Sequence, residues 1–266
     1  MPIGRQAITS PDATGGAMSG HSKWSQIKRQ KGAADTKRGM RFTKLAREII
    51  VAVRQGSADP ESNARLRLAI ARAREENMPL DNIERAIKKG SGEGGEGAAL
   101  EEVTYEGYGP GGAAILVQAL TDNRNRTVAE VRSAFTRHSG SLGEAGSVGW
   151  LFEGKGVITL HVPGATADDL ALLAIDAGAE DVEVDDGTLE VRTPPERLEQ
   201  VRVALAGQAP IASAELAMVP KTIVPLDERT SVQTLRLLDH LEDLDDVQRV
   251  YCNADFPNEA LARLAG

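Results

Sequence analysis

Residues 42–56 read FTKLAREIIVAVRQG, and this stretch carries a clear helical pattern. Its apolar side chains recur every three or four residues, which places them on one side of a helix: Phe42, Leu45, Ala46, Ile49, Ile50 and Val53. Basic residues fall on the other side, namely Lys37, Arg41, Lys44, Arg47 and Arg54. The pattern therefore predicts an amphipathic helix that ends at Gly56 and holds a helical bundle together.

Two more helices are expected immediately downstream. Asp59 and Pro60 are typical of a helix start, with Asp as the cap and Pro in the first turn, and this helix extends to about Asn77. The next helix is expected over residues 80–89, with Gly90 ending it. Its inward side chains are Ile83, Ala86 and Ile87.

The segments upstream of these helices contain little apolar material. Residues 20–41 are rich in Lys, Arg and Gly, which predicts a short helix and a mobile basic arm. Residues 1–18 have neither the apolar core of a secretory signal nor the Arg-rich pattern of a transit peptide, so we expect a disordered tail. Met18 is an alternative start of the chain. The basic helical domain then covers residues 19–90.

Downstream of the helices, residues 90–97 hold five glycines, and a linker is expected over 91–97. Strands are predicted at 102–106 and 113–120, followed by a helix that a capping box, Thr127 to Glu130, opens toward His138. Residues 157–219 then follow the order β-α-β-β-α-β, which is typical of a ferredoxin-like unit. The expected strands are 157–162, 181–184, 188–191 and 214–219, and the expected helices are 167–177 and 195–206.

The last expected elements are a short strand at 222–225, a helix at 231–241 and a strand at 247–253. They have no partners of their own, so they could complete the sheet that begins at Glu102. The fold class is then α+β multidomain, with an N-terminal helical bundle and two α+β domains, one ferredoxin-like and inserted in the other. The discontinuous domain would cover 98–150 plus 222–266, and the insertion 151–221.

Charge is strongly segregated along the chain, although the net charge is only −8. Residues 19–89 hold 17 Lys+Arg against 8 Asp+Glu, whereas residues 90–266 hold 13 against 30. Such asymmetry indicates that the basic half meets a polyanion. The alternative is that the basic half docks on the acidic half of the same chain. Local clustering favours the polyanion, because residues 20–54 carry ten Lys+Arg and two acids.

Several enzyme motifs occur only in part. Residues 107–112 fit the spacing GxGxxG, but a strand follows where a phosphate-binding helix should begin. Residues 149–155 resemble a phosphate loop that lacks its Ser or Thr, and residues 25–28 match SxxK without its companion motifs. The four histidines are scattered, and the single cysteine, Cys252, fits a reducing compartment. We therefore expect no enzyme, no metal and no cofactor.

The candidate nucleic-acid contacts are basic residues, together with Trp24, whose ring could stack on a base. Arg124 and Arg126 precede a helix start, where they could bind phosphate or pair with nearby carboxylates, and the two interpretations are equally favoured. The full set of candidates is His21, Lys23, Trp24, Lys28, Arg29, Lys31, Lys37, Arg38, Arg41, Lys44, Arg124 and Arg126.

A set of short motifs resembles the YebC/PmpR family, densely over residues 20–156 and more loosely beyond. The motifs are GHSKW at 20–24, FTKL at 42–45, REI at 47–49, NMP at 77–79, DNI at 81–83, RAIKKG at 85–90, YEGYGPGG at 105–112, LTDNRNRT at 120–127 and GSVGW at 146–150. The residues before Met18 depart from the family pattern. The resemblance implies a helical bundle and two α+β domains, one inserted in the other. It also implies a DNA-binding transcriptional regulator, and some relatives look like ribosomal translation factors, including mitochondrial translational activators.

The functional expectation is therefore a cytoplasmic, nucleic-acid-binding regulator of gene expression that makes no use of a membrane. DNA-binding transcription regulation is placed first, slightly ahead of an RNA-binding translation factor whose partner is ribosomal RNA or the ribosome. A protein partner at the acidic α+β half is a third alternative, and an enzyme with an unrecognised cleft site is the fourth.

Overall fold

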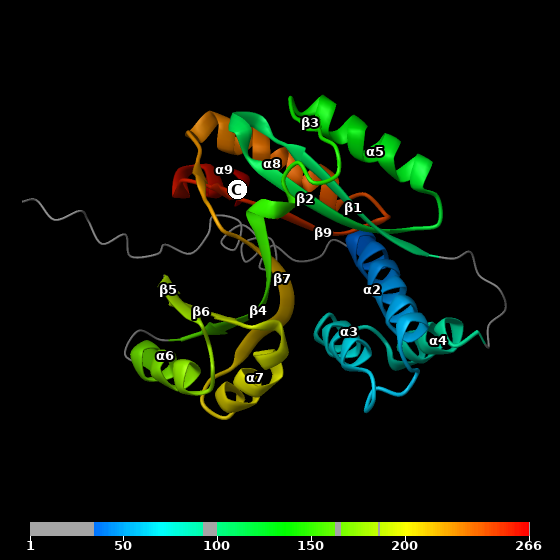
Figure 1. The fold of residues 1–266 in the computed structure, drawn as a ribbon, viewed down its shortest axis with the longest axis vertical. Coiled ribbons are helices and arrows are strands. Elements are labelled where there is room, and N and C mark those ends of the chain that lie inside the picture. Colours follow the sequence, from blue (N-terminus) through cyan, green and yellow to red (C-terminus); the bar gives the residue numbers. More distant parts are fainter. Residues whose placement is uncertain (1–34, 93–99, 163–165, 186, 266) are drawn as a thin grey trace, which may run out of the picture. The chain divides into compact units, whose positions relative to one another are not determined.

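The structure is a computed structural model that describes residues 35–92, 100–162, 166–185 and 187–265 (Figure 1). The expected tail at 1–18, the basic arm up to residue 34 and most of the expected linker lie outside these ranges. The described chain forms two compact units. One comprises residues 156–216, and the other comprises 35–155 together with 217–265. None of the described helices is long and apolar enough to cross a membrane.

The predicted helical bundle is present and packs around one apolar cluster. It consists of α2 (Asp35–Gln55), α3 (Ala64–Glu75) and α4 (Leu80–Gly90). The predicted apolar stripe of the first helix faces inward, since Ile49 is fully buried and Leu45 nearly so. These side chains pack against Leu66, Ala69, Ile70, Ala73, Met78, Ile83 and Ala86 from α3, α4 and the turn between them.

The predicted start of α3 at Asp59 and Pro60 is wrong. The helix begins at Ala64, and its cap is Asn63, whose side chain accepts a hydrogen bond from the Leu66 amide at 3.0 Å. The same side chain donates to the Ala52 carbonyl at 2.8 Å and to the Ser57 carbonyl at 2.7 Å, so one buried amide ties α3 to α2. Asp59 instead accepts from the Glu61 amide within the preceding turn.

The helix ends at Gly90, as the sequence predicted, with the glycine as the last residue of α4 and Ser91 as the cap. A Cβ atom at this position would lie 2.7 Å from the Val53 Cβ. The glycine therefore also allows α4 to approach α2 closely, a packing role that the sequence did not predict.

The first sheet has the strand order β3-β1-β2-β9 and joins distant parts of the chain. The strands are β1 (Glu101–Tyr108), β2 (Ala114–Thr121), β3 (Ser141–Leu142) and β9 (Val247–Cys252). The antiparallel pairing of β9 with β2 confirms that the C-terminal strand completes the sheet begun near Glu102. Short strands β8 (Val224–Pro225) and β10 (Ala254–Asp255) pair with each other.

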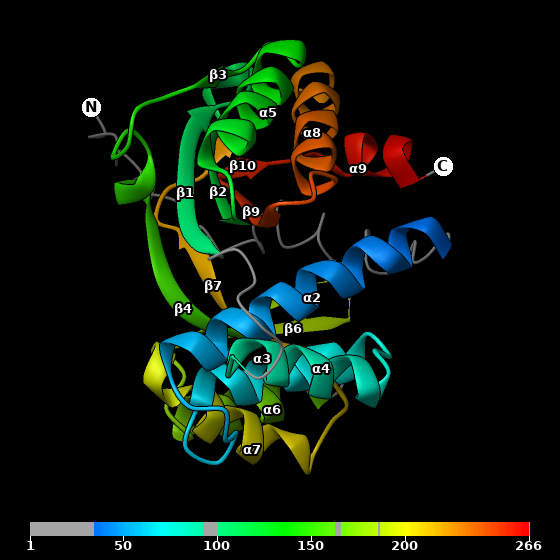
Figure 2. The same cartoon turned by 90° about the vertical axis from the view of Figure 1, so that its right-hand side faces the viewer.

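Two helices, α5 (Arg124–Arg137) and α8 (Glu228–Glu242), lie side by side over this sheet (Figures 1 and 2). The predicted capping box at Thr127 is wrong, because α5 begins three residues earlier and Asn123 caps it through the Arg126 amide. Thr127 is buried in the helix and uses its hydroxyl elsewhere. A final helix, α9 (Asn258–Ala265), was not predicted.

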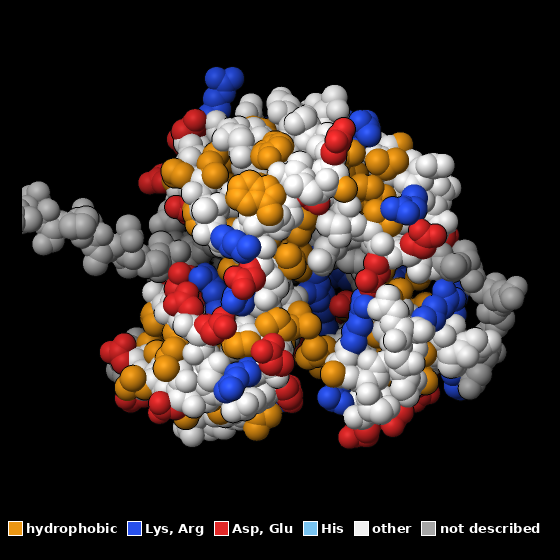
Figure 3. Space-filling model, viewed as in Figure 1, with side chains coloured by type: hydrophobic (Ala, Val, Ile, Leu, Met, Phe, Trp, Pro, Cys, Tyr) orange, Lys and Arg blue, Asp and Glu red, His pale blue; other side chains and the backbone are white. Residues whose placement is uncertain are grey.

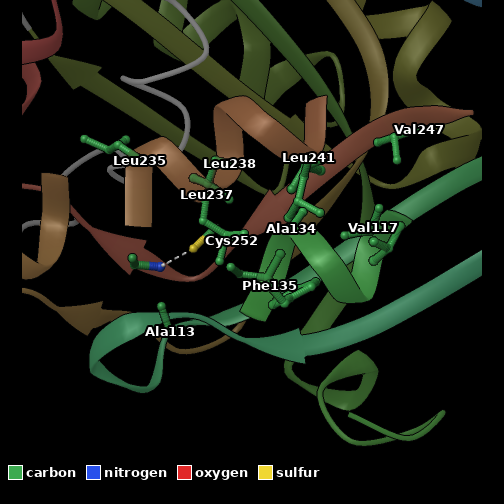
Figure 4. Packing of buried hydrophobic residues seen from close by; sticks show 14 of the residues in the cluster. Ala113, Val117, Ala134, Phe135, Leu235, Leu237, Leu238, Leu241, Val247 and Cys252 are labelled. Carbon is green, nitrogen blue, oxygen red and sulfur yellow. Dashed lines mark hydrogen bonds between the residues drawn. The ribbon is translucent and has the colours of Figure 1, made fainter. Parts of the chain in front are cut away.

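The core beneath these helices is apolar and well filled (Figure 4). Phe135 from α5 and Leu237 from α8 are fully buried among strand residues such as Val117. Cys252 lies in the same core and accepts a hydrogen bond from the Ala254 amide at 3.4 Å. Burial raises the pKa of its thiol to about 12, so this cysteine is no nucleophile near neutral pH.

The second unit confirms the predicted ferredoxin-like order and its insertion. Its sheet runs β5-β6-β4-β7, with α6 and α7 in the connections. The elements are β4 (Phe152–His161), α6 (Ala167–Asp176), β5 (Asp181–Asp185), β6 (Thr188–Thr193), α7 (Leu198–Ala206) and β7 (Ile211–Pro220). Because β4 enters the unit and β7 leaves it for β8, the unit interrupts the first α+β domain.

The bundle should be sensitive to loss of a single buried side chain. We expect Ile49→Ala to lower the free energy of unfolding by about 2–5 kcal/mol, because the cavity cannot close between three packed helices. Arg74→Ala, an exposed position on α3, should change it by less than about 0.5 kcal/mol. Urea titration of both variants measures the difference. Equal costs at the two positions would show that the helical phase is wrong.

Candidate nucleic-acid interface

Half of the predicted contact residues lie outside the described residues, namely His21, Lys23, Trp24, Lys28, Arg29 and Lys31. Two others lie where the described chain begins, because Lys37 and Arg38 stand near the start of α2, and Arg38 is exposed.

Further along α2, basic side chains bind other parts of the protein. Arg41 forms an ion pair with Glu76 at 3.2 Å, with both side chains more than a third exposed. Lys44 donates to the Glu242 carbonyl at 2.6 Å, at the end of α8. Lys44 is thus engaged in joining the bundle to the α+β domain.

Arg47 makes two contacts with the loop before β9. One of its guanidinium nitrogens donates to the Asp245 carbonyl at 2.7 Å and to the Asp246 carboxylate at 2.9 Å. A second ion pair joins the same surfaces, between Glu48 on α2 and Arg249 on β9 at 3.3 Å. These contacts show that the face of α2 opposite its apolar stripe is partly a structural interface.

Asp246 is the centre of this interface and is 1% exposed. Its Oδ2 accepts from the hydroxyl of Thr121 at 3.1 Å, from the hydroxyl of Thr127 at 2.7 Å and from the Arg126 guanidinium at 2.6 Å. Its Oδ1 accepts from Arg47. Through these hydrogen bonds, one carboxylate in the loop before β9 connects the bundle, the end of β2 and the start of α5.

The ionised form of Asp246 is the stable one despite its burial. Burial alone would raise the pKa of this carboxyl, but donation from Arg126, Thr127 and Thr121 outweighs it and holds the pKa below the ordinary value. The same pairing raises the pKa of Arg126. Both groups are therefore charged near neutral pH.

The two candidate arginines, which the structure places in the first turn of α5, have different surroundings. Arg126 pairs with Asp122 at 2.9 Å and with Asp246 at 2.6 Å, which is the carboxylate pairing that the sequence left open. Arg124 is exposed and lies 3.8 Å from Glu101, which is also exposed. Both side chains are exposed, 66% for Arg124 and 44% for Arg126, but two carboxylates already pair with Arg126. Arg124 is therefore the better placed of the two for a phosphate contact.

Sequence reasoning missed several exposed cations. Arg74, Lys88 and Lys89 lie on α3 and α4, and Arg132 and Arg137 lie on the outer face of α5. Arg132, Ser133 and Arg137 line a shallow depression on that helix together with Val128, Ala129 and Thr136. The missing signal was helical phase: only the position of α5 on its sheet shows which of its arginines face outward.

The inserted unit is strongly acidic and holds few cations. Residues 156–216 contain 12 Asp+Glu and 3 Lys+Arg. Figure 3 shows acidic side chains over the unit that contains β5, β6 and α6. Arg192, one of its three cations, is enclosed by Asp181, Glu183 and Glu190. This surface would repel phosphates.

The histidines give one correction. They are scattered in the sequence, but the fold brings His138 and His240 together, with Nε2 of the first 3.0 Å from Nδ1 of the second. Burial, His240, Arg137 and Arg236 hold the pKa of His138 below its ordinary value. Within the described ranges, no third metal-binding side chain joins this pair, and no cluster of three or more such residues occurs.

Comparison with known families identifies two matching segments. Residues 22–93 match the family described as the TACO1/YebC protein N-terminal domain, and residues 100–254 match the TACO1/YebC second and third domain. Together these segments cover the bundle, both α+β domains and most of the predicted basic arm.

Individual relatives match over most of their length. A probable transcriptional regulatory protein from Dehalococcoides mccartyi, DET0444, is 57% identical over 247 residues, covering 92% of this chain and 98% of the relative. One from Desulfosudis oleivorans is 58% identical over 238 residues, covering 89% and 96%. The crystal structure of the conserved hypothetical protein Aq1575 from Aquifex aeolicus superposes with a TM-score of 0.77 at 49% identity, covering 84% of this chain and 92% of that one.

Proposed function

The chain belongs to the TACO1/YebC family, and from this premise we propose that it is a nucleic-acid-binding regulator of gene expression. Its curated relatives carry the name probable transcriptional regulatory protein, which supports a regulatory role. The specific form proposed here is a DNA-binding transcriptional regulator that acts in the cytoplasm and catalyses no reaction.

The observation that carries the proposal is the basic segment 20–54, with ten Lys+Arg against two acids. A polyanion binds such a segment by releasing its counterions, independently of base sequence. The described contacts divide this segment by role. Lys44 and Arg47 hold the α+β domain, whereas Arg38 is exposed at the arm end of α2. The proposed surface is therefore the arm together with the first turn of α2, with Arg124 as an outlying contact.

A second candidate is an RNA-binding translation factor that associates with the ribosome. An exposed tryptophan, Trp150, favours it, because RNA recognition relies on stacking unpaired bases against aromatic rings. A protein partner on the acidic 156–216 unit is compatible with either candidate, since that surface suits a basic protein better than a phosphate backbone.

Crosslinking in cells distinguishes the two candidates. We expect ultraviolet crosslinking of the full chain, followed by sequencing of the recovered nucleic acid, to return promoter DNA if the transcriptional proposal is right. Recovery dominated by ribosomal RNA would replace it with the translational one. Recovery of no more nucleic acid than with a variant in which Lys28, Arg29, Lys31, Lys37 and Arg38 are changed to Glu would refute both.

A further inference from the structure

Trp150 is held on the surface of the first α+β domain with its side chain 66% exposed. Tryptophan combines a large apolar ring with one polar edge, so an exposed indole on an ordered turn is suited to bind a flat ligand. Its neighbours in the chain explain why it points outward. Val148 is fully buried and Phe152 is 4% exposed, and both belong to an apolar cluster with Leu116 and Tyr251 on the sheet. These two anchors force the residue midway between them toward solvent.

The turn that carries Trp150 is fixed by one carboxylate. Glu106 on β1 accepts hydrogen bonds from the amides of Gly146, Val148 and Gly149 at 2.8, 2.7 and 2.6 Å. Burial opposes the charge on Glu106, but these three donors outweigh it and hold its pKa below the ordinary value. The backbone under Trp150 is therefore organised before any ligand arrives.

A second aromatic ring is fastened to the same turn. The Trp150 indole donates to the Ser147 carbonyl at 3.2 Å, and the Tyr108 hydroxyl donates to that same oxygen at 2.9 Å. Tyr108 is also 38% exposed. Both polar ring edges are thus occupied within the protein, so what Trp150 offers to a ligand is the flat face of its ring.

We propose that Trp150, supported by Tyr108 and Lys221, is a stacking site for an unpaired base of a single-stranded nucleic acid. Lys221 is exposed, and its amide donates to the Leu151 carbonyl at 2.8 Å, which places a cation on the chain beside the tryptophan turn. An aromatic face beside a cation is the combination that binds a base and its phosphate without regard to sequence. This inference rests on the proposed nucleic-acid function and adds a second contact, far along the chain from the basic arm.

The surroundings of Trp150 favour a base over a protein partner. A tryptophan that anchors a protein interface lies within a ring of other contacts that exclude water. Residues 143–147 on the same turn read GEAGS and are exposed or half-exposed. A base needs only the ring face and the space above it. Either RNA or melted DNA supplies such a base, and the choice of probe separates these sources.

The test measures affinity for short oligonucleotides with the full chain. We expect Trp150→Ala to weaken binding of a U12 or dT12 single strand by roughly 5- to 100-fold, the range for one lost base stack. Trp150→Phe should retain most of the affinity, because it keeps a ring. Leu172→Ala is the matched control, since Leu172 is 67% exposed on α6 and has no assigned role. If Trp150→Ala weakens binding of U12 more than binding of dT12, the base belongs to RNA. If it weakens binding of dT12 more, the base belongs to melted DNA.

A spectroscopic readout accompanies the affinities. With 5-fluorotryptophan incorporated, the chain gives two ¹⁹F resonances, for Trp24 and Trp150, which Trp150→Phe assigns. We expect the Trp150 resonance to shift on adding the single strand. Unchanged affinity for Trp150→Ala together with an unshifted resonance overturns the inference. The inference is also wrong if Trp150→Ala weakens binding of a fully paired duplex as much as binding of the single strand. It is wrong as well if Trp150→Ala loses co-sedimentation with ribosomes or polymerase while its affinity for the oligonucleotide is unchanged. If Trp150→Ala has no effect but charge reversal of the basic arm still abolishes binding, the proposed nucleic-acid function stands and only the stacking site is wrong. If the unmodified chain binds no nucleic acid, both are wrong.

Discussion

Reversing the charge of five basic residues at the arm end of the bundle should lower nucleic-acid affinity by at least about 10³-fold. The residues are Lys28, Arg29, Lys31, Lys37 and Arg38, each changed to Glu. Each lost phosphate contact also removes the counterion release that drives binding. Gel shift at several salt concentrations measures the effect. If the unmodified chain neutralises six phosphates, its affinity should fall about 10³-fold between 50 and 200 mM salt, and the variant should show a much shallower slope.

The fold should survive these five changes. Lys37 and Arg38 lie at the start of α2, where acidic side chains suit the positive end of the helix dipole. Arg38 is exposed and lies outside the apolar cluster of the bundle. The melting temperature should therefore stay close to that of the unmodified chain, and a folded variant with unchanged affinity would exclude the arm as the binding surface.

A matched control separates a local surface from net charge. Five exposed arginines of the acidic half, Arg132, Arg137, Arg197, Arg229 and Arg236, are changed to Glu, which alters the net charge by the same amount. We expect this control to retain affinity to within about tenfold, because screening limits its influence at 0.15 M salt. Equal losses in the two variants would mean that overall charge, rather than the arm, governs binding.

Replacing Asp246 by Asn should lower the free energy of unfolding by about 3 kcal/mol, a large effect for one atom exchanged. Asp246 is almost fully buried and accepts from four side chains, two of them cationic. The Asn side chain is uncharged, and its NH₂ group replaces one carboxylate oxygen, so a hydrogen-bond donor would face the donors that surround Asp246. Arg47 and Arg126 keep some exposure, so water recovers part of the loss. Asp245→Asn, an exposed neighbour, removes the same charge and should cost less than about 0.5 kcal/mol.

The contribution of Asp246 should also depend on pH in a defined direction. Its pKa in the folded state lies below the unfolded value, which is near 4. The stabilisation is therefore complete above that unfolded value and is lost as the pH falls through the folded pKa. Denaturant titrations from pH 7 to pH 3 should show the unmodified chain losing its advantage over Asp246→Asn only below about pH 4. A constant difference down to pH 3 would contradict this account.

A double-mutant cycle identifies which connection the carboxylate provides. Arg47→Met should be less harmful in the Asp246→Asn background than alone, because the two side chains share a 2.9 Å ion pair between the bundle and the α+β domain. Additive effects would show that Asp246 acts only within the α+β domain, through Thr121, Thr127 and Arg126.

Local patterns in the sequence were sufficient for most elements and for the class of fold. The apolar stripe from Phe42 to Val53 predicted α2 because helical periodicity involves only residues close in sequence. The β-α-β-β-α-β order of 157–219 was predicted in the same way, from the local pattern of each element. Charge segregation likewise needed no structure, because counterion release depends on how many cations lie together. Helix starts were less predictable: Asn63 and Asn123 cap their helices, whereas Asp59 and Thr127 carried equally good local signals.

Tertiary structure alone decided which charged and aromatic side chains are available to a ligand. Lys44 and Arg126 are candidate phosphate contacts in the sequence, but Lys44 binds the Glu242 carbonyl and Arg126 binds the Asp246 carboxylate, both far away along the chain. Trp150 stands between Val148 and Phe152 in the sequence, and the sheet buries those two and leaves the indole exposed to water. Local sequence determines how the chain bends and where charge accumulates. The exposure of a side chain depends on contacts between segments that are distant in the sequence, and these contacts form only when the chain folds.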